Sequence, residues 1–262
     1  MNRPAPASRE PLLGADDPPP VAGVNPQGRS AFLLLGDHAG RAIPRGLGEL
    51  GVSPADLGRH IASDIGIREL GELLARALDA VFLHQAYSRL VIDCNRDPLS
   101  PEAIPERSDG SAIPGNRGLS ADERNQRIAA IHEPYQSAIG AEITRRGLAR
   151  LPTILVALHS FTPVMGGAAR PWEAGVLHAS ANDGFAKALL DRLRERPGAV
   201  IGDNEPYRMD GTDHTVPRHA FASGLPYAEI EVRQDLIATP DGQRRWSAIL
   251  AAALEEARRA TA

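Results

Sequence analysis

The sequence predicts a single α/β domain in which helices flank a mixed, mostly parallel β-sheet. The length of 262 residues, with 42% hydrophobic and 24% charged residues, is typical of a globular protein. From residue 30 onward, short apolar runs alternate with amphipathic stretches, which is the pattern of a sheet covered by helices. No run of about 18 apolar residues occurs, so we expect no transmembrane helix.

The expected strands are short runs of Leu, Ile, Val and Ala that end at polar or turn residues. They cover residues 31–35, 90–93, 153–158, 199–201 and 228–232. In open α/β sheets, ligands bind beyond the carboxyl ends of the strands. The polar residues that follow these runs are therefore the first candidates for a functional site.

The expected helices have apolar residues three or four positions apart. They cover residues 67–78 and 120–143, the second with its apolar periodicity at 128–143, and two more lie at about 182–196 and 241–259. The second helix opens with a capping box, in which Ser120 and Glu123 satisfy each other's free backbone N–H groups. Pro134 lies inside this helix and predicts a kink or a break, because proline removes one N–H donor and clashes with the preceding turn.

The composition excludes several classes of protein. Cys94 is the only cysteine, which rules out a disulfide framework and a cysteine-based zinc site and suggests a reducing compartment. The net charge of −4 provides no basic field to attract nucleic acid or an anionic membrane. Residues 1–29, rich in Pro, Ala, Gly and Asp, predict a flexible arm ahead of a domain at 30–262. We expect a cytoplasmic protein that acts on a small molecule.

Two of the expected strands lead into a histidine. His38 follows the first strand in the segment GDHAGRAIP, and His159 ends the segment TILVALH. Imidazoles held on neighbouring strand ends can converge on one ion, and the glycines beside His38 would let the backbone approach a ligand. The alternative for both histidines is a polar loop with local hydrogen bonds.

A catalytic zinc site needs a third protein ligand and keeps one position open for water. Asp64, at the start of the first predicted helix, is the best candidate, and its alternative role is that of a helix N-cap. His132 and Glu133 are adjacent, so their side chains would point about 100° apart on a helix and chelate poorly.

A polar turn follows the expected strand at 90–93. Arg96 has the planar fork that suits a carboxylate, and Asn95 beside it offers both a donor and an acceptor. A structural salt bridge with Asp93 or Asp97 explains Arg96 equally well.

Alternation in the last expected strand places Glu229, Glu231 and Arg233 on one face. Charges on one face of a core strand are costly unless they are paired or used. One of the two glutamates is therefore a candidate general base, and a solvated edge strand is the alternative.

The motifs around these residues resemble those of the N-formylglutamate amidohydrolase family. They are GDHAGRAIP (36–44), SDIG (63–66), DCNRDP (93–98), HEPYQ (132–136), LHSF (158–161) and EIEVRQDL (229–236), and the similarity spans about residues 30–257. The resemblance implies a fold related to metallocarboxypeptidases and to phosphorylase/hydrolase-like proteins. It also implies zinc-dependent hydrolysis of an N-acyl bond on an amino acid such as N-formylglutamate.

The resemblance implies roles for individual residues. Zn²⁺ or another divalent ion would be bound by His38, His159 and Asp64, with Glu231 as general base and Asn95 and Arg96 on a substrate carboxylate. Candidates for a second carboxylate are Arg233 and Arg117, while His132 and His214 would steady the oxyanion or close the cleft, and the loop 98–117 would form a lid. The alternatives are hydrolysis of another N-acyl amino acid or a small peptide, and non-catalytic binding of an acidic metabolite.

The chain departs from the family pattern at three positions. Ala39 stands where the family often has serine, and Gln136 where it has a second histidine. Arg41 stands where the related carboxypeptidase-type enzymes carry a glutamate.

Overall fold

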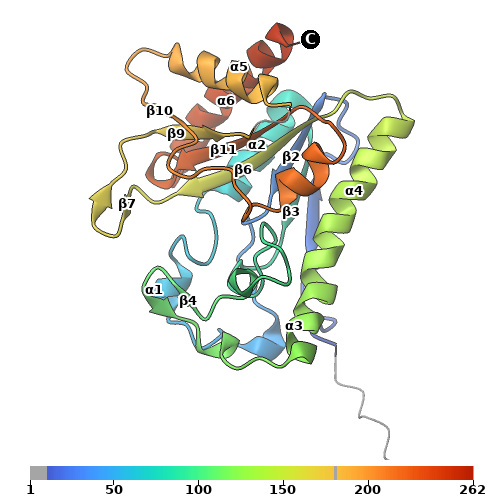
Figure 1. Cartoon of the computed structure of the whole chain (residues 1–262), viewed down its shortest axis with the longest axis vertical. Coiled ribbons are helices and arrows are strands. Elements are labelled where there is room, and N and C mark those ends of the chain that lie inside the picture. Colours follow the sequence, from blue (N-terminus) through green and yellow to red (C-terminus); the bar gives the residue numbers. More distant parts are fainter. Residues whose placement is uncertain (1–10, 180–181, 262) are drawn as a thin grey trace, which may run out of the picture.

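The structure is a computed structural model that describes residues 11–179 and 182–261 (Figure 1). These residues contain a seven-stranded sheet in the order β1-β3-β2-β6-β11-β9-β10. Its strands are β1 (Val21–Val24), β2 (Phe32–Gly36), β3 (Val81–Gln85), β6 (Ile154–Phe161), β9 (Ala174–Leu177), β10 (Ile201–Asp203) and β11 (Tyr227–Arg233). Two short hairpins lie outside it, β4 (Arg107–Ser108) with β5 (Ser111–Ala112) and β7 (Val164–Met165) with β8 (Ala168–Ala169).

The sheet is mixed and mostly parallel, which confirms the predicted fold class. β3, β2, β6 and β11 run parallel to one another, whereas β1 and β9 are antiparallel to their neighbours β3 and β11. The side chains of β2 alternate between two hydrophobic clusters, with Phe32 and Leu34 in one and Leu33 and Leu35 in the other. All four are buried, because both faces of a central parallel strand are covered.

Helices cover the two faces of the sheet (Figure 1). They are α1 (Pro54–Leu57), α2 (Ile67–Leu78), α3 (Ala121–Arg127), α4 (Glu133–Leu148), α5 (Gly184–Arg194) and α6 (Pro240–Ala260). α2, α5 and α6 pack together on one face, where Trp246 and Leu250 of α6 are buried. α4 packs on the other face, where Tyr135 and Ile139 are buried. Within the part of the chain that is described, no helix is both long and apolar enough to cross a membrane.

The strand predicted at 90–93 is wrong. These residues form a turn in which the N–H of Asp93 donates to the carbonyl of Ala103 at 2.7 Å, and the strand lies earlier, at β3. Val91 and Ile92 are fully buried, and an apolar run alone does not distinguish a buried turn from a buried strand. The strand predicted at 199–201 begins only at Ile201, and the sequence patterns indicate neither β1 nor β9.

The irregularity predicted at Pro134 is a π-helical turn rather than a break. This turn, Ile128–His132, joins α3 to α4, and the N–H of Glu133 donates to the carbonyl of Ile128 five residues earlier. The wider turn accommodates proline, which has no N–H of its own. The predicted capping box of Ser120 and Glu123 starts α3.

The segment ahead of residue 30 contributes to the sheet. β1 is an edge strand antiparallel to β3, with Val21 opposite Gln85. The hydroxyl of Tyr87 donates to the carbonyl of Pro18 at 2.6 Å. Of the arm expected at 1–29, the part from residue 11 therefore packs on the domain, and residues 1–10 lie outside the described residues.

Candidate metal centre

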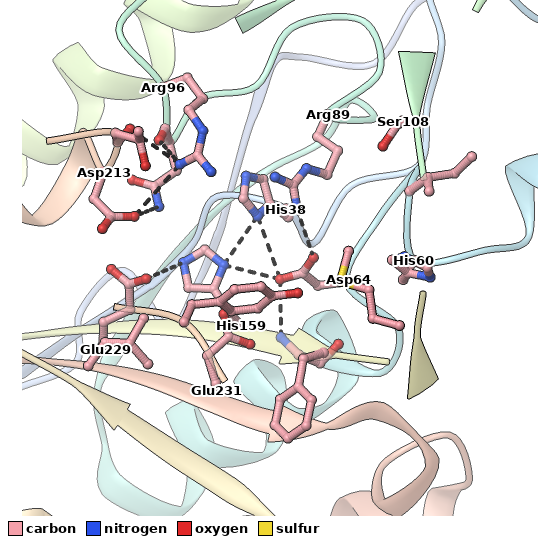
Figure 2. Close-up of a pocket in the computed structure, with 18 of the residues that line it drawn as sticks. His38, His60, Asp64, Arg89, Arg96, Ser108, His159, Asp213, Glu229 and Glu231 are labelled. Atoms are coloured by element: carbon pink, nitrogen blue, oxygen red, sulfur yellow. Dashed lines mark hydrogen bonds and ion pairs between the residues drawn. The ribbon is translucent and has the colours of Figure 1, made fainter. Parts of the chain in front are cut away.

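Two histidines and an aspartate meet at the carboxyl ends of β2 and β6 (Figure 2). His38 follows β2 by two residues, His159 lies near the end of β6, and Asp64 lies in the loop before α2. β2 and β6 are neighbouring parallel strands, so their carboxyl ends share one edge of the sheet. One ligand atom from each side chain lies within 4.8 Å of the other two. We call these three residues the metal cluster.

The geometry of the metal cluster fits a divalent ion. His159 Nδ1 lies 3.2 Å from His38 Nδ1 and 3.1 Å from Asp64 Oδ2, and His38 Nδ1 lies 3.6 Å from Asp64 Oδ2. Ligand atoms at about 2.0–2.1 Å from a tetrahedral zinc ion lie about 3.3 Å from one another. Three such atoms leave one position of the tetrahedron for water or substrate.

A carboxylate stands behind each histidine of the metal cluster. His38 Nε2 lies 2.7 Å from Asp93 Oδ1, and His159 Nε2 lies 3.4 Å from Asp37 Oδ2. A carboxylate at one ring nitrogen favours a proton on that nitrogen and leaves the other free to bind a metal. The free nitrogen is Nδ1 in both rings. Sequence reasoning missed Asp37, although it precedes His38 directly.

Asp64 is oriented toward the metal cluster and does not cap a helix. The N-cap of α2 is Gly66, whose φ of 82° suits glycine. Asp64 Oδ2 accepts the N–H of Ser160 at 3.1 Å. Burial alone would raise the pKa of Asp64, but its interactions with the neighbouring imidazoles of His38 and His159 lower it well below its usual value. Asp64 is therefore an anion at neutral pH.

Sequence reasoning also missed Arg89, which joins two carboxylates of the site. Its Nε and Nη2 donate to Asp93 Oδ2 at 3.0 and 2.6 Å, and its Nη1 lies 3.6 Å from Asp64 Oδ1. Asp93 therefore forms its salt bridge with Arg89, which stands four residues before it. Arg96 instead lies 3.7 Å from Asp213.

Two buried glutamates of β11 face the metal cluster (Figure 2). β11 lies between β6 and β9, so the alternative of an edge strand is wrong. Glu229 and Glu231 are 2% and 6% exposed, and each has one carboxylate oxygen without a hydrogen-bond partner among the described residues. Burial raises the pKa of both to about 8, because desolvation disfavours the charged form. Glu229 Oε1 lies 4.0 Å from His159 Nε2, on the side of the ring that faces away from Asp64.

A cavity of about 350 Å³ opens over the metal cluster, a volume within the range of small-molecule sites. The metal cluster, both glutamates, Asn95 and Arg96 line it. The amide oxygen of Asn95 accepts the N–H groups of His214 and Thr215. Arg96 Nη1 donates to the carbonyl oxygens of Asn95 and Thr212. Asn95 thus holds the segment 212–215 in place, while Arg96 is fixed at the wall of the cavity.

Four other residues predicted to contact substrate do not line this cavity. Arg233 donates through Nε to Asp235 Oδ1 at 2.8 Å and is absent from the cavity lining. His132 is fully buried, with Nε2 3.1 Å from the carbonyl of Arg96, and the ring of His214 lies beside it at 5.2 Å. Arg117 is exposed. In the lid predicted at 98–117, two residues line the cavity, Ser108 and Asp109.

Residues 30–238 match the family described as N-formylglutamate amidohydrolase. The chain belongs to this family. A crystal structure of a gene product from Agrobacterium tumefaciens has a TM-score of 0.92 at 34% sequence identity, over 95% of this chain and 99% of that one. The crystal structure of N-formylglutamate amidohydrolase from Ralstonia eutropha has a TM-score of 0.73 at 18% identity, over 93% and 100%, and so shares the fold. No curated protein matches the chain.

Two motifs of this amidohydrolase chain meet behind the cavity rather than in it. Gln136 of HEPYQ donates through Nε2 to the carbonyl of Cys94 at 2.8 Å and to Thr215 Oγ1 at 3.1 Å. Its Oε1 lies 2.8 Å from His219 Nε2. α4 therefore holds the DCNRDP turn in position, which explains why an amide can stand where the family has a second histidine.

The first motif of the amidohydrolase chain contains a glycine with a packing role. A Cβ atom at Gly40 would lie 2.2 Å from the backbone of Ala86, so this glycine permits close contact between two chain segments rather than with a ligand. Arg41 donates to Ser63 Oγ at 3.2 Å and is absent from the cavity lining. The third member of the metal cluster is therefore Asp64, and the side chain at position 41, where the related carboxypeptidase-type enzymes carry a glutamate, points elsewhere.

Proposed function

We propose that this chain is a metal-dependent hydrolase that cleaves the amide bond of an N-formyl or other N-acyl amino acid. An acidic amino acid derivative, N-formylglutamate, is the first candidate. In this reaction the C–N bond breaks, the hydroxyl of water joins the acyl carbon, and the remaining proton goes to the amine nitrogen. The supporting observation is a buried metal cluster beside two buried carboxyl groups that have unpartnered oxygens.

Zn²⁺ is the cation that this set of ligands favours, because two imidazoles, one carboxylate and an open position are a common arrangement for catalytic zinc. Bound there, it would supply a Lewis acid that polarises the acyl oxygen and acidifies water. Asp93 and Asp37 orient His38 and His159 for this role.

Glu231 is the proposed general base. It lines the cavity beside the metal cluster and has a carboxylate oxygen without a partner among the described residues. Glu229 instead lies 4.0 Å from Nε2 of His159, the ring nitrogen that does not contact Asp64. Glu231 accepts a proton from water and returns it to the leaving nitrogen. Burial holds its pKa at about 8, and positive charge at the metal cluster favours the carboxylate form that accepts the proton.

Arg96 is proposed to hold the α-carboxylate of the substrate. It lies on the Asp213 side of the metal cluster (Figure 2). Its two hydrogen bonds to carbonyl oxygens fix the guanidinium, and a fixed fork orients a carboxylate well. The scissile amide, one bond from the α-carbon, then extends toward His38 and His159.

Metal analysis combined with an amidase assay tests the proposal. We expect about one divalent ion per chain, loss of N-formylglutamate hydrolysis after chelation, and recovery with Zn²⁺. His38→Ala should lose both the ion and activity, whereas the control His178→Asn, which is outside the cavity lining, should keep both. A folded chain that binds no divalent ion and hydrolyses no N-acyl amino acid would be a non-catalytic member of the family.

A further inference from the structure

The cavity continues past the metal cluster on the side away from Arg96. Arg96 and Asp213 lie on one side of His38 and His159, and His60 and Ser108 lie on the other (Figure 2). A substrate whose carboxylate is held by Arg96 and whose amide lies over the metal cluster would extend its acyl group toward the second side. The chemistry of that side therefore determines which acyl groups fit.

The register of the sheet identifies the floor of this second side. Glu229 pairs with Ala157, Glu231 with His159, and Arg233 with Phe161. In Figure 2, Glu229 lies on the Asp213 side. Phe161 has the same orientation as His159 and lies about 7 Å farther along β6, so it forms the floor on the side away from Arg96.

The side chains on this second side are mostly apolar. Phe161, Ile61, Met165 and Tyr207 all line the cavity there, and we call these four residues the apolar wall. Phe161 and Ile61 are buried. The nearby Asp109 is paired with Arg59, whose Nη2 lies 2.5 Å from Asp109 Oδ2. His60 Nε2 lies 3.5 Å from the same oxygen and has no hydrogen-bond partner among the described residues.

Arg170, which does not line the cavity, holds three members of the apolar wall together. Its guanidinium lies over the ring of Tyr207 at 4.8 Å and over the ring of Phe161 at 5.8 Å. Its Nη1 donates to the Tyr207 hydroxyl at 3.0 Å, and its Nη2 lies 2.8 Å from Met165 Sδ. Arg170 is thus a positioning residue that fixes the β7–β8 hairpin against the segment around Tyr207.

We propose that the apolar wall is an acyl-binding site, and that this chain hydrolyses N-acyl amino acids with an aliphatic acyl chain longer than formyl more efficiently than the N-formyl compound. This inference rests on the proposed amide hydrolysis and specifies its substrate class. A formyl group has one carbon and, held over the metal cluster, would be too short to extend along the wall. A longer chain removes its own surface and that of Phe161, Met165 and Tyr207 from water.

A series of N-acylglutamates with formyl, acetyl, propionyl and butanoyl groups tests the inference on the zinc-loaded full chain. The acetyl, propionyl and butanoyl amides have similar intrinsic reactivity, so their kcat/KM values report on binding of the chain. We expect kcat/KM to rise about fourfold per added methylene, the factor that corresponds to burial of one CH₂ group. The rise should come mainly from KM.

Two neighbouring residues of β7 provide a matched pair of variants. Met165 lines the cavity, whereas Val164 is 50% exposed and outside the lining. Met165→Ala should reduce the rise to less than about twofold per methylene while leaving N-formylglutamate hydrolysis within about twofold. Val164→Ala should change neither the rise in kcat/KM per methylene nor the hydrolysis of N-formylglutamate. Arg170→Met should also reduce the rise per methylene, because it releases the hairpin without removing a wall residue; it also removes a positive charge that acts on Glu231, so only the rise per methylene is compared.

The outcomes separate this inference from the proposed function. If N-formylglutamate is hydrolysed but kcat/KM falls steadily from acetyl to butanoyl, the acyl-binding site is overturned and the amidohydrolase remains. Equal effects of Met165→Ala and Val164→Ala would also overturn it. If the zinc-loaded chain hydrolyses no member of the series, both proposals fail.

Discussion

Arg127 and the metal cluster both bury charge, but the protein satisfies that charge in different ways. The guanidinium of Arg127 donates to two carbonyl oxygens and to the amide oxygen of Asn116 at 2.7–3.1 Å. Around the metal cluster, Glu229 and Glu231 each keep one oxygen without a partner among the described residues. A buried polar group without a partner costs about 1–3 kcal/mol. Buried atoms without a partner also occur elsewhere, for example at Arg146 and Arg196, but those of Glu229 and Glu231 lie where chemistry is expected.

This difference distinguishes buried polar groups that stabilise the fold from buried polar groups that are kept for the chemistry of the site. Removing a satisfied group such as Arg127 leaves its partners without hydrogen bonds and should lower stability. Removing an unsatisfied group such as Glu231 relieves a cost of burial and should affect turnover instead. The following substitutions test that separation, in order of decreasing expected effect.

Glu231→Gln should lower kcat by about 10²–10⁴-fold, because a general base contributes that much to proton transfer. The free energy of unfolding should stay the same or rise, since a buried carboxyl becomes a neutral amide. Steady-state kinetics measures kcat, urea unfolding measures the free energy of unfolding, and metal analysis checks that the ion is still bound. Glu229→Gln should cost less in kcat, and loss of metal from the Glu231 variant would show that Glu231 is a ligand.

Arg127→Met should lower the free energy of unfolding by about 3 kcal/mol, because it leaves three buried acceptors without a donor. Turnover measured well below the melting temperature should not change. The matched control is Arg124→Met on the same helix, which removes one hydrogen bond of 3.3 Å and should cost less than about 1 kcal/mol. Equal losses from both variants would contradict the structural role of Arg127.

Asp93→Asn should weaken zinc binding by about 10–100-fold, because the carboxylate behind His38 sets the proton position and orientation of that ring. A competition titration with a chelating dye measures this change. Asp97→Asn, four residues along the same turn and exposed, should stay within about twofold of the wild type. Unchanged zinc affinity in the Asp93 variant would exclude a role for Asp93 behind the metal cluster.

His219→Gln should make the protein less sensitive to acid. Burial, followed by the charge of Arg218, lowers the pKa of His219 to about 4 in the folded state. Between pH 6.5 and 4 the unfolded chain therefore binds more protons here than the folded chain, so the stability from this group is lost as pH falls. At pH 5 that loss is about 2 kcal/mol. Urea unfolding of the wild type and the variant at pH 7 and pH 5 measures this loss. The free energy of unfolding should fall less between the two pH values in the variant, and equal falls in the two proteins would contradict the prediction.

The two histidines of the metal cluster could be predicted from sequence because each follows an apolar run that had to be a buried strand. The folded sheet places the two strands side by side, and because neighbouring parallel strands end at the same edge, His38 and His159 come close. Alternation likewise places Glu229 and Glu231 on the cavity face of β11. Asp64 needed the family resemblance, since its position in the sequence is equally typical of an N-cap.

The same patterns do not say how far along a strand the cavity reaches. Arg233 alternates in sequence with Glu229 and Glu231, but it is absent from the cavity lining and donates to Asp235 instead. The segment 90–93 has the composition of a strand but forms a buried turn, and that turn brings Asp93 to His38. In both cases the contacts of the folded chain, rather than the local pattern, decide the outcome.

The sequence by itself determined the α/β class, the buried strands and the residue types at their carboxyl ends, because periodicity records which side chains face the core. Only the tertiary structure decided which of these residues meet. His38 binds a carboxylate 55 positions away and faces a histidine 121 positions away. Arg170 likewise contacts Met165 and Tyr207, two residues of the apolar wall that lie far apart in the sequence. Such contacts depend on strand register and on the paths of the loops, and no short stretch of sequence specifies either one.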